Sequence, residues 1–129
     1  GLSGFLNSLA NTKASYPTSE LFFRAILCNW LVCLAFFLPY RVKGDGTKIF
    51  IMLFLVVCFF VSGYEHSIAN MSLFAISIAT QAADAVPFDA IIHNLIPVTL
   101  GNLVGATLFM SYFYYYLNKP FKEIDGDNK

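Results

Sequence analysis

Residues 63–70 read Gly-Tyr-Glu-His-Ser-Ile-Ala-Asn, and this stretch decides how the chain folds. It places an acid beside a histidine between two apolar runs, residues 49–63 and 67–83, neither of which contains a charged residue. Ionisable side chains are costly in lipid, so they normally face a protein interior or a permeation pathway. The stretch therefore indicates a membrane transport protein rather than a soluble core.

The composition is typical of a membrane protein. Hydrophobic residues make up 57% of the chain and charged residues 12%, whereas a soluble domain has about 25% charged residues. The 8 basic and 8 acidic residues cancel, so no basic surface indicates a nucleic-acid partner. All 3 cysteines lie in apolar runs, and we interpret them as small buried hydrophobic residues. No cofactor or metal is predicted.

Apolar stretches long enough for a membrane cover residues 21–40, 49–83 and 91–117. A bilayer core about 30 Å thick needs about 20 helical residues. As one straight helix the second stretch would be about 50 Å long, which is more than ordinary tilt absorbs. Gly63 and the polar residues after it therefore predict a broken helix with limbs 49–63 and 67–83. Such breaks are tolerated where they line a cavity or are buried in protein.

The charges in the loops predict the orientation. The 40–48 loop and the tail 119–129 carry most of the lysines, whereas the 84–90 loop carries two aspartates and no basic residue. By the positive-inside rule, the first two segments are cytoplasmic and the third is outside. Residues 1–20 are then an outer segment or the end of a preceding helix. A multi-pass protein of the cell membrane with a cytoplasmic C-terminus is expected.

His66 is the first candidate for a functional residue, because an ionisable group inside a span is functional by default. The start of the second limb would place it at the positive end of a helix dipole, which favours a neutral imidazole. A neutral imidazole donates one hydrogen bond and accepts another. For Glu65 we favour local structural support, as a carboxylate that caps backbone amides near Ser67 and Asn70.

Two amides and two glycines inside the spans are further candidates. Asn29 and Asn102 could form hydrogen bonds between helices, or they could orient His66 or contact a solute; the sequence leaves this open. Gly101 and Gly105 form a small-xxx-small pair, which favours close approach of two helices.

Phe59 and Lys13 each have a structural and a functional interpretation. An aromatic residue in a span is usually a packing residue, but Phe59 lies about two turns before His66 and could form a hydrophobic constriction. A lysine before a span is usually only solvated, but Lys13 at a pore mouth would attract anions.

Together these residues resemble the formate/nitrite transporter family. The matching strings are residues 24–35, 62–71 and 94–105, which read RAILCNWLVCLA, SGYEHSIANM and NLIPVTLGNLVG. They occur in the family's order and spread over most of the chain.

The resemblance implies an aquaporin-like six-helix fold built from an inverted repeat of three plus three helices, assembled as a homopentamer with a pore in each protomer. It implies that His66 is the central pore histidine and that Asn29 and Asn102 surround it. It also implies that Lys13 lies in the outer vestibule and that Phe59 belongs to a constriction. This chain supplies three transmembrane helices, the middle one broken, and lacks the N-terminal three-helix repeat.

The first hypothesis is transport of small monovalent weak-acid anions, with formate first, nitrite second, then lactate, acetate or hydrosulfide. A second hypothesis, a metal-dependent membrane enzyme, is disfavoured because His93 is the only other histidine and no His-Glu-x-x-His string exists. A third is an inactive structural half or interaction fragment. The anion, the direction of flux and the choice between channel and proton-coupled transport stay open.

Overall fold

The computed structural model describes residues 1–80 and 85–117, and every regular element in these ranges is helical. The predicted all-helical class is thus confirmed. The elements are α1 (Leu2–Ala14), α2 (Thr18–Phe37), the 3-10 turn η1 (Leu38–Arg41), α3 (Asp45–Val61), α4 (Ser67–Ala79), α5 (Phe88–Val104), the π-helical segment η2 (Gly105–Tyr112) and α6 (Phe113–Leu117).

Prolines set the starts of the two longest helical segments. Pro17 directly precedes α2 and Pro87 directly precedes α5, with φ values of −59° and −66°. A proline at a helix start loses nothing, because its missing N–H would have no partner there. Asp89 lies in the first turn of α5, where a negative charge is favourable.

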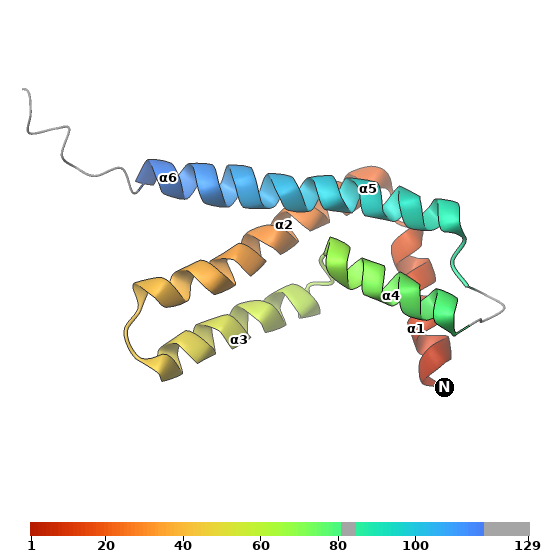
Figure 1. The fold of residues 1–129 in the computed structure, drawn as a ribbon, viewed down its shortest axis with the longest axis horizontal. Helices are drawn as coiled ribbons and strands as arrows, with labels where there is room; N and C mark the ends of the chain where they lie inside the picture. Colours follow the sequence, from red (N-terminus) through yellow and green to blue (C-terminus); the bar gives the residue numbers. More distant parts are fainter. Residues whose placement is uncertain (81–84, 118–129) are drawn as a thin grey trace, which may run out of the picture.

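One long helical rod runs along the molecule, and the other helices pack on it or beside one another (Figure 1). The segments α5, η2 and α6 run on from one another, and α2 packs along α5 and η2. α3 returns beside α2, and α4 continues from the point where α3 ends. α1 packs against α4 and α5, so the segment expected as an outer stretch or helix end at residues 1–20 contains a helix that belongs to the same body.

Small residues hold α2 against α5. A Cβ atom added at Gly101 would lie 2.7 Å from the Ala25 Cβ, and one added at Gly105 would lie 2.5 Å from the Ile26 carbonyl oxygen. Only glycine leaves room for this close approach. A second buried cluster joins α1, α4 and the start of α5, and consists of Ala10, Ala14, Phe74, Val86 and Ile91.

The outer surface of the fold is strongly apolar. α3 has no buried residue, and its exposed side chains include Phe50, Leu53, Phe54 and Phe60. Apolar exposure of this extent needs cover by lipid or protein. Within the described ranges, two helical segments are long and apolar enough to cross a membrane, Thr18–Arg41 and Phe88–Tyr116. The predicted tail 119–129 and residues 81–83 of the predicted limb 67–83 lie outside the described residues.

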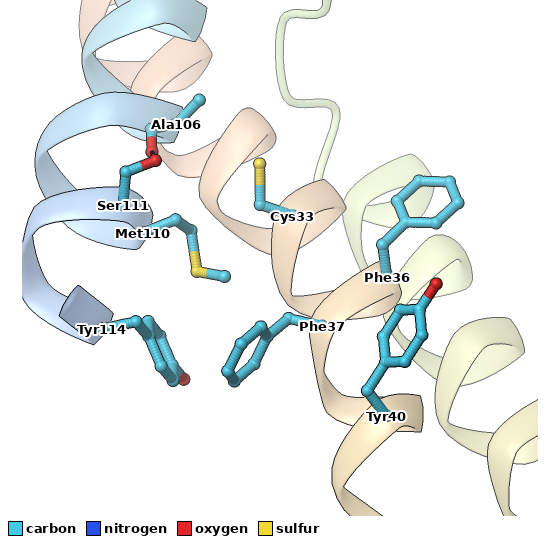
Figure 2. Close-up of a pocket in the computed structure, with 8 residues that line it drawn as sticks. All are labelled: Cys33, Phe36, Phe37, Tyr40, Ala106, Met110, Ser111 and Tyr114. Carbon is cyan, nitrogen blue, oxygen red and sulfur yellow. Dashed lines mark hydrogen bonds between the residues drawn. The ribbon is translucent and has the colours of Figure 1, made fainter. Parts of the chain in front are cut away.

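A cavity of about 440 Å³ lies between α2 and the η2–α6 end of the rod (Figure 2). Its lining is mostly apolar, with the hydroxyls of Ser111, Tyr40 and Tyr114 as its polar groups, and none of the described lining residues is charged. Ligand sites carry a few convergent polar groups in an apolar wall. Among the described residues this cavity offers an anion no charged partner, whereas the buried ion pair of the chain lies elsewhere.

Candidate functional site

The helix break at residues 62–66 is the centre of the polar chemistry. α3 ends at Val61 and α4 begins at Ser67, so the interruption falls inside the stretch that the length argument indicated. Gly63 has φ +63° and its N–H donates to the Phe60 carbonyl at 3.1 Å. This left-handed conformation suits glycine because it has no Cβ. The chain can therefore leave α3 sharply and present His66 in an extended conformation just before α4.

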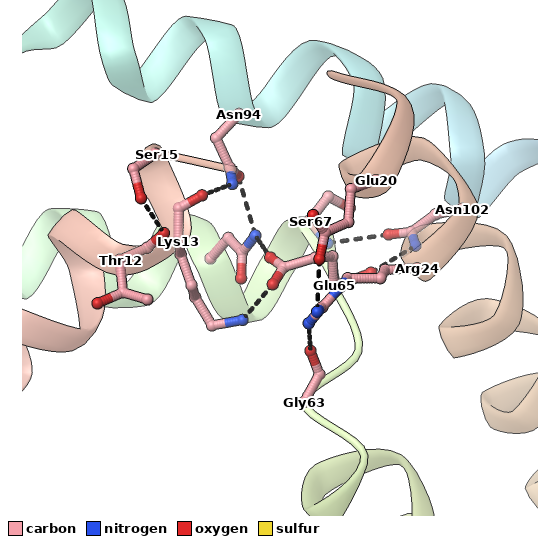
Figure 3. A network of polar contacts seen from close by, with 11 residues as sticks. Thr12, Lys13, Ser15, Glu20, Arg24, Gly63, Glu65, Ser67, Asn94 and Asn102 are labelled. Carbon is pink, nitrogen blue, oxygen red and sulfur yellow. Dashed lines mark hydrogen bonds and ion pairs between the residues drawn. The ribbon is translucent and has the colours of Figure 1, made fainter. Parts of the chain in front are cut away.

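Asn102 on α5 holds the backbone on both sides of His66 (Figure 3). Its Oδ1 accepts a hydrogen bond from the Ser67 N–H at 2.9 Å, and its Nδ2 donates to the Glu65 carbonyl at 3.0 Å. Nδ2 also donates to the Ala25 carbonyl of α2 at 2.9 Å. The cap on the first turn of α4 is therefore supplied by Asn102, not by the Glu65 carboxylate as the sequence had suggested, because an amide from a neighbouring helix reaches the free N–H.

Asn29 supports the same arrangement from α2. Its Nδ2 donates to the backbone carbonyl of Asn102 at 2.6 Å. Both amides therefore bind backbone groups of another segment and connect helices, which is the first of the two interpretations the sequence left open. Their hydrogen bonds within the described ranges do not involve the imidazole.

The Glu65 carboxylate is fully buried and lies in what we call the Glu65 network, consisting of Lys13, Glu65, Asn70 and Asn94 (Figure 3). Lys13 Nζ is 2.7 Å from Oε1, and Asn70 Nδ2 donates to Oε2 at 2.5 Å. Asn70 Nδ2 also donates to Asn94 Oδ1 at 2.9 Å, and Asn94 Nδ2 donates to the Lys13 carbonyl at 2.8 Å. A buried carboxylate needs such partners, so the network ties α1, the break, α4 and α5 together.

The network changes how Lys13 and the two further amides are understood. Lys13 was expected as a lysine at a pore mouth, yet its ammonium is paired with a carboxylate and its side chain is 17% exposed. Asn70 and Asn94 are buried network members whose side-chain roles the sequence analysis missed. Their signal was the same as that of Asn29 and Asn102, an amide inside an apolar run.

Arg24 braces the break from the other side. Its Nη1 donates to the Gly63 carbonyl at 3.3 Å, and its Nη2 is 2.6 Å from Glu20 Oε1. The guanidinium also lies over the Tyr16 ring, 4.6 Å from the centroid. The loop that contains Gly63 is thus attached to α2 as well as to α5.

His66 lies where two cavities meet. The first, about 290 Å³, has Lys13, Asn70 and His66 in its wall. The second, about 320 Å³, is lined by apolar side chains apart from His66. Phe59 lines both cavities as well. The imidazole is partly buried and makes no hydrogen bond to another described residue, so both of its nitrogens can contact a solute.

His93 is in a different place. One of its ring nitrogens, Nε2, is 3.0 Å from Thr18 Oγ1 at the start of α2. Within residues 1–80 and 85–117, no group of three or more His, Cys, Asp or Glu side chains is placed to hold a metal ion.

The sequence profile of the family described as formate/nitrite transporter matches residues 2–116. The chain belongs to the formate/nitrite transporter family. This confirms the resemblance based on the three strings. Because this is a family of membrane transporters, the exposed apolar helices are those of a membrane protein.

Individual members of the formate/nitrite transporter family are also similar to this chain in sequence. The chain is 56% identical over 114 residues to an uncharacterized transporter, YwcJ, of Bacillus subtilis, covering 88% of this chain and 44% of that protein. It is 42% identical to the nitrite transporter NirC of Salmonella typhimurium, covering 88% and 42%. It is 35% identical to the formate channel FocA of Haemophilus influenzae, covering 85% and 45%. These relatives are transporters or channels, in agreement with the prediction that the chain is not an enzyme.

A solved structure titled FNT family ion channel has the same fold over the matched part. The TM-score is 0.81 at 42% identity, covering 88% of this chain and 45% of that chain. The chain thus spans about half the length of the relatives it matches.

Proposed function

We propose that this chain forms half of a pore that carries small monovalent weak-acid anions across the cell membrane. Formate is the first candidate and nitrite the second, with lactate, acetate and hydrosulfide as further possibilities. The choice is supported by relatives named as a nitrite transporter and a formate channel. The observation that carries the proposal is the position of His66 between a cavity with polar groups and an apolar one.

The chemistry at His66 follows from the cost of charge in an apolar space. An anion in the first cavity accepts a hydrogen bond from the imidazole, or takes a proton from the imidazolium. In the second case the ring becomes neutral, the anion becomes a neutral acid, and the ring regains a proton from water. The neutral acid can cross the apolar cavity, whereas moving an unpaired charge into it has a large cost in free energy.

The surrounding residues have supporting roles in this proposal. Asn102 keeps the backbone next to His66 in place, Asn29 supports Asn102, and Phe59 narrows the path as part of a hydrophobic constriction. Lys13 attracts the anion: an ammonium has three donors, and its bond to Glu65 uses one of them. Gly63, Gly101 and Gly105 allow the break and the close packing of α2 on α5.

We further propose the arrangement in the membrane. Three spans, the middle one formed by α3 and α4, cross the bilayer with the C-terminus in the cytoplasm. An upstream three-helix repeat completes the pore, and the protein assembles as a homopentamer. The exposed apolar face of α3 is expected to contact lipid or one of these neighbours.

Anion uptake tests the proposal. The chain with the proposed upstream repeat is reconstituted in liposomes, and uptake of formate, nitrite and lactate is compared with that of protein-free liposomes. Uptake of at least one anion above the protein-free rate is expected. If none enters faster, the proposed function is wrong. The chain alone serves as the second sample, because flux without the upstream repeat would show that one half is sufficient.

A further inference from the structure

The two cavities at His66 share three lining residues, Phe59, His66 and Ala69. Ala69 lies in the first turn of α4, three positions after His66, and its side chain is exposed. The three residues therefore belong to the wall that the two cavities share, and we call this place the neck.

Phe59 and His66 are the two bulky members of this set. The Phe59 ring packs on the Phe60 ring, with centroids 4.6 Å apart. The backbone on either side of His66 is fixed by Asn102, through Ser67 and Glu65. Ala69 contributes only a methyl group to the shared wall, so it is the smallest of the three side chains there.

We propose that Ala69 sets the width of the neck and thereby selects for the smallest acids. This inference rests on the proposed function and adds a limit on the size of the transported anion. Formate and nitrite each have three non-hydrogen atoms, whereas acetate and lactate carry additional carbon. With a methyl group at residue 69, formate and nitrite pass the neck readily. A larger side chain at this position discriminates more strongly against acetate and lactate.

The test replaces Ala69 by a larger and by a smaller residue. In the liposome assay, Ala69→Leu should lower lactate uptake relative to formate uptake by about tenfold or more, since one methylene alone discriminates by about 10–200-fold in a tight apolar site. Ala69→Gly should shift the ratio in the opposite direction. The matched control is Ala75→Leu, the same change at an exposed position of α4 that lines neither cavity, and it should leave the ratio unchanged.

The outcomes separate this inference from the proposed function. Parental protein that carries no anion overturns both. If parental protein carries formate and the lactate-to-formate ratio stays the same in Ala69→Leu and in Ala69→Gly, then Ala69 does not set the size limit, although the proposed function stands. If Ala69→Leu does not fold, as judged by size-exclusion chromatography, the Ala69→Gly ratio decides: a rise supports the inference and an unchanged ratio overturns it.

Discussion

Asn102 Oδ1 on α5 accepts a hydrogen bond from the Ser67 N–H at 2.9 Å, so one helix supplies the cap for the first turn of another. The same side chain donates to the Glu65 and Ala25 carbonyls. The position of His66 thus depends on a residue that is 36 positions away in the sequence and only 6% exposed.

Removing this cap should destabilise the fold. Asn102→Ala leaves the Ser67 N–H and the Glu65 carbonyl without this partner, and each buried unsatisfied group costs about 1–3 kcal/mol. We expect a clear fall in the melting temperature in detergent. Ser72→Ala, which removes an exposed hydroxyl that bonds only within α4, is the control and should have little effect. Equal melting temperatures for the two variants would contradict the structural role of Asn102.

The Lys13–Glu65 pair should show strong coupling in a double-mutant cycle. Lys13→Met leaves the buried Glu65 carboxylate without its cation, and breaking a buried pair on one side costs about 3–5 kcal/mol. Adding Glu65→Gln removes the unpaired charge and should restore much of the loss. Denaturant unfolding of the two single variants and the double variant measures the coupling. Additive losses would mean that the two side chains do not interact.

Because α2 packs closely on α5, replacing Gly101 by a larger residue should destabilise the fold. Gly101→Ala places a Cβ against the Phe22 carbonyl and 2.7 Å from the Ala25 Cβ, and overpacking of this kind costs about 1–3 kcal/mol. Gly46→Ala is the matched control, because a Cβ there meets nothing within 4 Å. Thermal unfolding should separate the two variants, and a Gly101→Ala protein as stable as Gly46→Ala would contradict the packing.

The conformation of Gly63 gives a prediction of a different kind. A Cβ at Gly63 has space, since the nearest atom is Arg24 Nη1 at 3.9 Å, but φ is +63°. Gly63→Ala should therefore cost about 1–2 kcal/mol through backbone strain alone. Gly63→Asn should cost less, because asparagine visits this conformation more readily. If the two variants unfold at the same temperature, the left-handed backbone conformation does not determine which residues are tolerated at position 63.

Much of the fold could be predicted because its signals are local. The length of the 49–83 run and Gly63 within it located the break, since a straight helix of that length does not fit a bilayer. The spacing of Gly101 and Gly105 predicted close packing, and the structure places both against α2.

The hydrogen-bond partners at the site could not be predicted, because they come from distant segments. Lys13 and Glu65 are 52 residues apart, and nothing in either local sequence selects the other. Asn94 looked like Asn29 and Asn102, an amide in an apolar run, yet it belongs to the Glu65 network rather than to the backbone near His66. Which partner an amide takes depends on how the helices cross.

The central claim is that His66 handles the anion between the two cavities. It is tested most directly by comparing formate uptake into liposomes from pH 5 to pH 8 for the parental protein, His66→Asn and His66→Phe, each with the proposed upstream repeat. We predict that both variants change the rate of uptake or its dependence on pH, because neither side chain can exchange a proton with the anion. Uptake that matches the parental protein at every pH in both variants would contradict the claim.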